Sequence, residues 1–266
     1  MGINDIHTYM SLIFYGKHSA DWLDTLSVDL LPSLSPIITN IYNHHNYCHK
    51  LQLQSQTKLH YILPLLETHM IDLYARKIKA MMPELETIKT FMCKKKFHDY
   101  VINNNLLDYI PKTYTSIDDI PNAKRVITKP YNLNSGSGMH ITTRIREKDF
   151  INRIVQEYLT GNKEYCAYIV AKNGKIQLCI VYEYTFEKNM HIKTANNNMT
   201  MEKIILDQKY INQLELFLLP CLYNGICNMD FKMDNNLLKV LEINPRLGGS
   251  LMKSDEVIKK TICVFN

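Results

Sequence analysis

The stretch LEINPRLGGS at residues 241–250 decides how this sequence is interpreted. Its first half alternates apolar and polar residues, as a strand does, and its second half is a proline–arginine–glycine turn. Because alternate side chains of a strand point to the same face, Glu242 and Asn244 are expected side by side. A carboxylate and an amide offer the oxygen atoms that a hard divalent cation binds. Arg246 follows directly and is placed to hold a phosphate or a carboxylate.

A third oxygen ligand comes from the preceding apolar run, NMDFKM at residues 228–233. Asp230 lies twelve residues before Glu242, and residues 234–236 between the two runs indicate a hairpin turn. Such a hairpin places Asp230 beside Glu242. Few protein ligands are needed when phosphates supply the others, so the hairpin predicts a nucleotide site for Mg²⁺, or for Mn²⁺ in its place. The alternative is a surface hairpin whose polar residues face water.

Two weaker motifs precede this hairpin. In KPYNLNSGSGM, residues 129–139, Lys129 ends a strand and a glycine–serine loop follows. A lysine supplies a point charge, and small residues let backbone N–H groups approach phosphate oxygens. Taken alone, this motif is equally a flexible loop beside a surface lysine. In VQEYLTGNKE, residues 155–164, Glu157 and Glu164 flank a turn at Gly161, and in isolation both are interpreted as surface glutamates.

Together and in this order, the three motifs resemble the ATP-grasp superfamily, most closely its carboxylate–amine ligases and carbamoyl phosphate synthetase-like members. The resemblance covers about residues 59–252. It implies an α/β (α+β) ATP-grasp fold with a shortened lid, preceded by a trimmed Rossmann-like N-terminal domain. The domains implied are residues 1–90 and 91–266, with the lid at about 112–155.

The resemblance also assigns roles at the phosphate end of the site. Lys129 matches the lysine that contacts the α and β phosphates, and Arg246 matches the arginine that steadies the transferred phosphoryl group. These two are the catalytic candidates. Lys94, in CKKKF, matches the lysine at the start of the ATP-grasp module. The loop that closes over the triphosphate is implied to be Ser135, Gly136, Ser137 and Gly138.

The remaining roles concern the base, the ribose and the metal. The resemblance implies that adenine is read at a hinge formed by Glu157, Tyr158 and Leu159, and that Glu164 binds the ribose hydroxyls. The metal ligands that it implies are Asp230, Glu242 and Asn244.

Three features depart from the family pattern. Leu133 and Ser135 replace two glycines of the loop, and Cys93 replaces the usual aspartate before Lys94. Only 17 residues separate Gly138 from Gln156, so the helix of the lid must be short. A shorter lid excludes water less well, which matters when a reactive intermediate hydrolyses.

By this resemblance the protein is expected to be an ATP-dependent ligase. It would join a small-molecule carboxylate to an amine through an acyl phosphate, releasing ADP and phosphate; an amino acid or small peptide is a suitable substrate. Two alternatives stay open. One is transfer of phosphate to another acceptor, such as carbamate or carboxyphosphate, and the other is a nucleotide-binding protein without turnover. The resemblance also allows a homodimer.

Composition excludes several other classes. Hydrophobic residues make up 46% and charged residues 21%, which is typical of globular proteins and not of collagen-like, disordered or disulfide-scaffold chains. The net charge of +5 is mild, so no nucleic-acid partner is expected. No secretory signal and no apolar run of 18 residues is found, so no membrane partner is expected. Seven cysteines without a CxxC pair predict a reduced, cytoplasmic protein.

Periodicity predicts the other elements. Asn173-Gly174 indicates a two-residue hairpin turn, and the strands expected are 59–65, 125–130, 154–159, 164–171, 175–184, 228–233 and 238–243. Helices are expected at 67–82, 94–104, 207–223 and 254–264, the last with Ser254 as its N-cap. HHNYCHK at residues 44–50 contains His44, His45, Cys48 and His49, but this spacing does not match a structural zinc site, and a polar loop is favoured.

Overall fold

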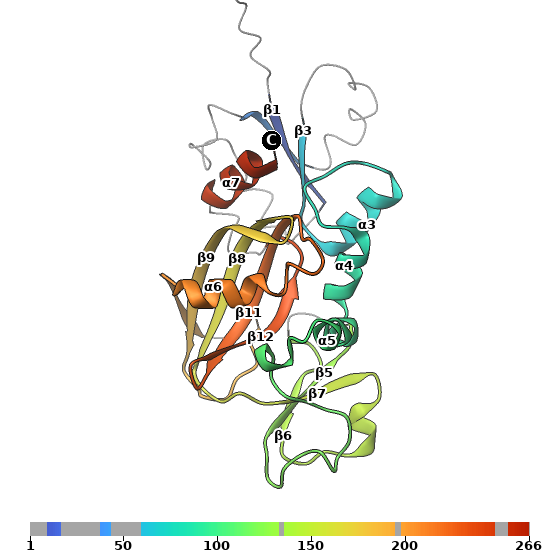
Figure 1. The fold of residues 1–266 in the computed structure, drawn as a ribbon, viewed down its shortest axis with the longest axis vertical. Helices are drawn as coiled ribbons and strands as arrows, with labels where there is room; N and C mark the ends of the chain where they lie inside the picture. The colour runs from blue at the N-terminus through green and yellow to red at the C-terminus, as the bar shows by residue number, and fades with distance from the viewer. Residues whose placement is uncertain are drawn as a thin grey trace, which may run out of the picture.

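The computed structural model describes residues 10–16, 38–43, 60–132, 136–194, 198–247 and 255–265. These residues form three sheets with helices packed around them, a mixed α/β architecture as predicted (Figure 1). The histidine-rich residues 44–50, the loop residue Ser135 and the predicted cap Ser254 lie outside the described residues.

The first sheet is parallel, with strand order β2-β1-β3. Its strands are β1 (Met10–Tyr15), β2 (Ile38–Asn43) and β3 (His60–Pro64), the last of which confirms the strand expected at 59–65. Helix α3 (Glu67–Ala75) follows β3. The single helix predicted to reach Met82 is wrong beyond Ala75, because Lys77 adopts φ 58° and the Met81 N–H donates to the Ile62 carbonyl at 3.0 Å. The chain therefore turns back onto β3.

Two helices connect this sheet to the rest of the molecule. Helix α5 (Lys94–Asn103) confirms the helix predicted at 94–104, and α4 (Leu85–Met92) was not predicted. The rings of Phe91 and Phe97 meet edge to face, with centroids 6.0 Å apart, which joins the buried sides of α4 and α5. A short 3-10 helix, η3 (Leu107–Tyr109), comes next.

The second sheet is antiparallel and has five strands in the order β10-β9-β8-β11-β12. Its strands are β8 (Lys163–Lys172), β9 (Lys175–Phe186), β10 (Met199–Ile204), β11 (Gly225–Asp234) and β12 (Leu237–Asn244). The predicted turn Asn173-Gly174 joins β8 to β9 with φ angles of 52° and 78°, the positive values that a type I′ turn requires. Asn235-Asn236 joins β11 to β12 in the same way, with φ 48° and 63°.

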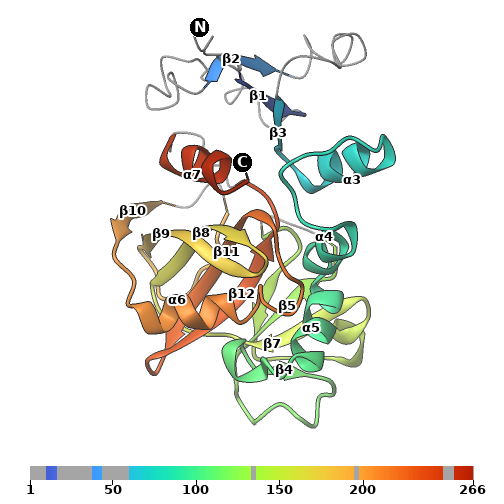
Figure 2. The same ribbon diagram turned by 45° about the horizontal axis from the view of Figure 1, so that its top comes forward.

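Alternate residues of the five-stranded sheet enter two different cores. On β8, Ala167 and Ile169 pack with side chains from α4, α5 and α6 (Gln208–Glu215). Cys166, Tyr168 and Val170 face the other way, toward β1, β3 and α7 (Asp255–Phe265). In Figure 2, α7 lies between the parallel sheet and the five-stranded one, where it packs on β8 and β9. This second face also carries the cavity described below.

Helix α6 is shorter than predicted. It ends at Glu215, so the single helix expected over 207–223 is wrong in its second half. Residues 216–222 form consecutive turns, and Leu222 adopts φ 46° before the chain enters β11. Helix α7 confirms the helix predicted at 254–264.

The third sheet is small and antiparallel, with order β4-β7-β5-β6. Its strands are β4 (Thr113–Tyr114), β5 (Val126–Pro130), β6 (His140–Thr142) and β7 (Arg153–Glu157), with the 3-10 helix η4 (Glu147–Phe150) before β7. Tyr114, Val126 and Val155 form its buried core. Among the described residues, no helix has the length and apolar character needed to cross a membrane.

Candidate functional site

A cavity of about 400 Å³ lies between the five-stranded sheet and the small sheet. Strands β8, β11 and β12 contribute one wall, and β5 contributes residues from the opposite side. The segment Glu157–Leu159, which links β7 to β8, and residues 191–194, which precede β10, line two further sides, and the cavity is open to solvent elsewhere. The volume lies in the range of pockets that hold nucleotide-sized ligands.

The three predicted metal ligands come together on one wall. Asp230 on β11 is the register partner of Glu242 on β12, as predicted, because the register shifts by one residue between Asp230 and Phe231. The Asn244 side-chain amide donates to Oε1 of Glu242 at 3.3 Å, so these two side chains do share a face. All three residues line the cavity.

This donor set fits a hard cation such as Mg²⁺, since it consists of two carboxylates and one amide oxygen. Within the described part of the chain, no group of three or more histidine, cysteine, aspartate or glutamate side chains is suited to hold a metal. The protein alone thus offers few ligands at this wall, and a bound metal needs oxygens from another source, such as phosphates.

Two buried lysines face this wall. Lys129, on β5, lines the cavity, and burial lowers its pKa to about 8; Glu242 acts in the opposite direction and Lys94 adds to the lowering. Lys94, at the start of α5, places its Nζ 3.9 Å from Oε2 of Glu242. It lies beside the cavity and does not line it. The predicted phosphate lysines thus adjoin the predicted metal ligands.

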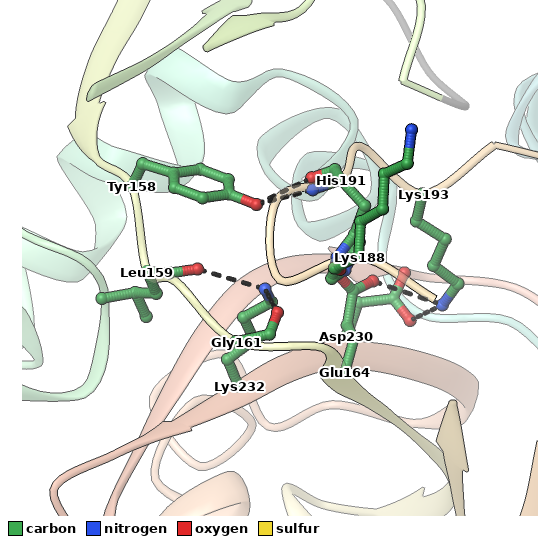
Figure 3. A network of polar contacts seen from close by, with 9 residues as sticks. All are labelled: Tyr158, Leu159, Gly161, Glu164, Lys188, His191, Lys193, Asp230 and Lys232. Atoms are coloured by element: carbon green, nitrogen blue, oxygen red, sulfur yellow. Dashed lines mark hydrogen bonds and ion pairs between the residues drawn. The ribbon is translucent and has the colours of Figure 1, made fainter. Parts of the chain in front are cut away.

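Two sets of hydrogen bonds hold the predicted adenine hinge in place (Figure 3). The Tyr158 hydroxyl donates to the His191 carbonyl at 3.0 Å and accepts from the His191 N–H at 2.9 Å. From β11, the buried Lys232 ammonium donates to the carbonyls of Leu159 and Gly161, at 3.1 and 3.2 Å. Burial lowers the pKa of Lys232, and Glu164 opposes that shift.

The two predicted glutamates lie at different places on the cavity. Glu157 is the last residue of β7, and its carboxylate forms an ion pair with Lys124. Glu164 is buried on β8, where Oε2 lies 3.7 Å from Nε2 of His191 and Oε1 lies 3.5 Å from Nζ of Lys193. Glu164 is therefore not the surface glutamate that its sequence context alone suggested.

The glycine loop reaches the cavity at one described position. Gly136 lines it with φ 74°, and a Cβ atom there would lie only 2.9 Å from the Ile192 side chain and the Lys193 carbonyl. A larger residue would force the loop away from residues 191–194. Ser137 and Gly138 are exposed and do not line the cavity; the Gly138 carbonyl instead accepts a hydrogen bond from Arg153.

Arg246 lines the cavity beyond Asn244. Its Nε donates to Oε1 of Glu67 at 3.0 Å, and both side chains are largely buried. Glu67 is the first residue of α3, so this ion pair joins the cavity to the helix that follows the parallel sheet.

Sequence reasoning missed three basic residues of the cavity: His191, Lys193 and Lys232. Lys232 had a usable signal, because it lies two residues after Asp230 on the same strand and so shares its face. His191 and Lys193 lie in the irregular stretch between β9 and β10, where no periodicity indicates which side chains turn inward.

A family model described as an ATP-grasp domain matches residues 93–250, which is more than half of the chain. The chain therefore belongs to the ATP-grasp family, as the motifs predicted. A comparison with curated proteins gives no match.

Solved structures show the same fold over nearly the whole chain. D-alanine–D-alanine ligase from Bacillus anthracis is 13% identical with a TM-score of 0.60, and the similarity covers 97% of this chain and 98% of that one. For L-amino acid ligase from Bacillus licheniformis, identity is 12%, the TM-score 0.59, and coverage 94% and 70%. Phosphoribosylamine–glycine ligase from Thermotoga maritima is 13% identical with a TM-score of 0.64, and the similarity covers 96% of this chain and 75% of that one. At these identities the likeness is one of fold.

Proposed function

We propose that this protein is an ATP-dependent ligase that joins a carboxylate to an amine. The observation that carries the proposal is the arrangement of Asp230, Glu242 and Asn244 on one wall of the cavity, with Lys129 opposite. This arrangement supports binding of a nucleoside triphosphate with a divalent cation. Family membership and the names of the three similar structures given above, each of them a ligase, support the reaction type.

In the proposed reaction, the γ-phosphoryl group moves from ATP to a substrate carboxylate. The bond from Pγ to the bridging oxygen breaks, a bond to the carboxylate oxygen forms, and ADP leaves. An amine then attacks the acyl carbon, and the amide forms as phosphate departs with loss of a proton from the amine. A divalent cation bound here supplies charge neutralisation at the phosphates. No protein nucleophile is needed, because positioning and electrostatics account for most of the catalysis.

Each named side chain has a proposed part in this scheme. Lys129, with Lys94 behind it, neutralises phosphate charge from the side of the small sheet. Arg246 holds the transferred phosphoryl group or the acyl phosphate, and Glu67 fixes the direction of its guanidinium group. The hinge Glu157–Leu159 reads adenine, and Glu164 accepts hydrogen bonds from the ribose hydroxyls.

The substrates are proposed to be small carboxylates and amines, such as amino acids or small peptides. The test is ADP release by the full chain with MgATP against pools of amino acids and small carboxylates, followed by mass spectrometry of the products. Release that needs both a carboxylate and an amine, with a new amide in the mixture, supports the ligase. Release with a carboxylate alone, without an amide, supports phosphate transfer. Binding of MgATP without any release supports a nucleotide-binding protein, and no binding refutes the proposal.

A further inference from the structure

Lys193 occupies the centre of the acidic wall of the cavity. Its Nζ lies 2.9 Å from Oδ1 of Asp230 and 3.5 Å from Oε1 of Glu164, so it bridges carboxylates on β11 and β8 (Figure 3). The ammonium also lies 4.2 Å from the centroid of the Tyr184 ring, within the range of a cation–π contact. Lys193 is thus held from three sides, although it comes from an irregular segment.

Lys193 binds one of the three proposed metal ligands, Asp230, at the oxygen that a bound cation would use. The Asp230 oxygen that Lys193 binds belongs to the proposed metal set, and charge-assisted bonds of this kind are strong. The other proposed carboxylate ligand, Glu242, accepts a hydrogen bond from the Asn244 amide nitrogen. To act as a ligand, Asn244 must turn its oxygen toward the metal. In this arrangement both carboxylates already have N–H donors.

The charge balance of the cavity also disfavours a divalent cation that binds without a nucleotide. Among the described residues that line it, and leaving His191 aside, four lysine or arginine side chains face four carboxylates. The formal charges of the side chains that line the cavity therefore balance without a ligand. A divalent cation added alone would stand beside the Lys193 ammonium with no anion to compensate it, and like charges at such distances repel strongly in a partly buried site. A triphosphate brings the missing negative charge.

We propose that Lys193 holds the place of the divalent cation in the nucleotide-free protein, so that the metal binds together with the nucleotide and not before it. This inference rests on the proposed function, because it takes Asp230 and Glu242 as metal ligands. Lys193 acts here as a positioning residue. It neutralises the repulsion between Asp230 and Glu164 and keeps a metal from binding Asp230 without nucleotide.

The segment that carries Lys193 is tied to the rest of the site. The backbone of His191 is bonded in both directions to the Tyr158 hydroxyl, and the His191 ring stacks on Phe186 with centroids 3.7 Å apart. Gly136 of the glycine loop packs directly against Ile192 and Lys193. Displacement of Lys193 by the nucleotide–metal complex is therefore expected to change the contacts of both the hinge and the glycine loop.

The test is Mn²⁺ binding to the nucleotide-free full chain, measured by electron paramagnetic resonance of the free ion. Wild type is expected to bind Mn²⁺ weakly, and Lys193→Met to bind it roughly tenfold more tightly or better, because the competing charge is gone. Lys193→Arg keeps the charge and should stay weak. Lys188→Met, which removes an exposed lysine from the same segment, is the matched control and should behave as wild type.

The gain in Lys193→Met must disappear when Asp230→Asn is added, which ties it to this wall. If Lys193→Met does not unfold cooperatively, Lys193→Gln provides the same comparison with a polar side chain. Equal Mn²⁺ binding by wild type and the neutral variants overturns the inference. Titration of wild type with MnATP distinguishes failure of this inference from failure of the proposed function. If MnATP binds but the neutral variants gain no affinity for Mn²⁺, only the role of Lys193 is refuted. If MnATP does not bind, the proposed function is refuted.

Discussion

The two sheets that border the cavity differ in the length of their strands and in the charged side chains that they direct into the cavity. In the five-stranded sheet, β8, β9, β11 and β12 run for 8 to 12 residues, whereas the strands of the small sheet have 2 to 5. The long strands carry the lining carboxylates Glu164, Asp230 and Glu242 together with Lys232, and the short strands β5 and β7 carry Lys129 and Glu157. The positions of Asp230 and Glu242, the acidic half of the site, thus depend on the pairing of two long strands. The position of Lys129, the basic half, depends on a small sheet whose core has three buried side chains.

The largest effect is expected from the acidic half. Glu242→Gln should lower kcat/KM by roughly a thousandfold, since a catalytic metal contributes several kcal/mol to stabilisation of the transition state. Steady-state ADP release measures the loss, and circular dichroism and the melting temperature should show an intact fold. Glu202→Gln, on the exposed edge strand β10 of the same sheet, is the matched control and should keep full turnover. Unchanged turnover in Glu242→Gln would remove this residue from the site.

The basic half should respond to substitution and to pH. Lys129→Met is expected to lower kcat/KM by roughly a hundredfold, because one pre-placed charge at the phosphates is lost. Since the pKa of Lys129 is lowered to about 8, its ammonium is charged below that pH and becomes neutral above it. The KM for ATP should therefore be flat below pH 8 and rise as the pH passes it.

Two variants make this pH prediction specific. Lys129→Arg keeps its charge and should abolish the rise in KM. Lys148→Met removes an exposed lysine from η4 near the same sheet and should leave both the KM and its pH profile unchanged. A rise in KM that persists in Lys129→Arg would assign the titration to another group.

A smaller effect is expected where the two sheets are joined. Lys232→Met removes two hydrogen bonds from a buried ammonium to the hinge carbonyls, and the KM for ATP should rise about tenfold with a smaller change in kcat. Lys239→Met removes a comparable bond, from Nζ to the Asp108 carbonyl at 2.7 Å, away from the cavity. This control is expected to lose stability and to keep the KM of wild type; equal KM values in both variants would show that Lys232 has no special part in nucleotide binding.

The smallest effect concerns stability alone. Val155→Ala in the small sheet is expected to cost about 1 kcal/mol of unfolding free energy, and Val170→Ala in the five-stranded sheet about 2 kcal/mol, because a cavity in the larger core collapses less easily. Denaturant unfolding measures both. Equal losses would mean that the two cores are equally well packed and would weaken the contrast between the sheets.

The parts of this fold that could be predicted from sequence are those set by local rules. The β11–β12 hairpin followed from alternation and a short polar turn, but the pairing of Asp230 with Glu242 also needs a one-residue register shift between Asp230 and Phe231, which the sequence did not indicate. The helices predicted to reach Met82 and Tyr223 end early, since tertiary hydrogen bonds and positive φ angles at Lys77 and Leu222 redirect the chain. Such contacts leave no periodic signal.

The candidate site shows the same division. Asp230 was expected beside Glu242 from the predicted hairpin, whereas Glu164, which its sequence context alone left at the surface, lines the same cavity. Lys193 could not be found, because its position depends on the path of an irregular segment fixed by Tyr158 and Gly136, far away in sequence. The domain boundaries at residues 1–90 and 91–266 and the individual residue roles stay predictions.

The central claim is that one cavity between two unlike sheets binds a nucleotide together with a divalent cation. Calorimetric titration of the full chain with a hydrolysis-resistant ATP analogue, with and without Mg²⁺, tests it most directly. The account predicts a single site whose affinity falls when Mg²⁺ is omitted, and falls again in both Glu242→Gln and Lys129→Met, although these residues lie on different sheets. Absence of binding, or binding that neither Mg²⁺ nor either substitution changes, would contradict it.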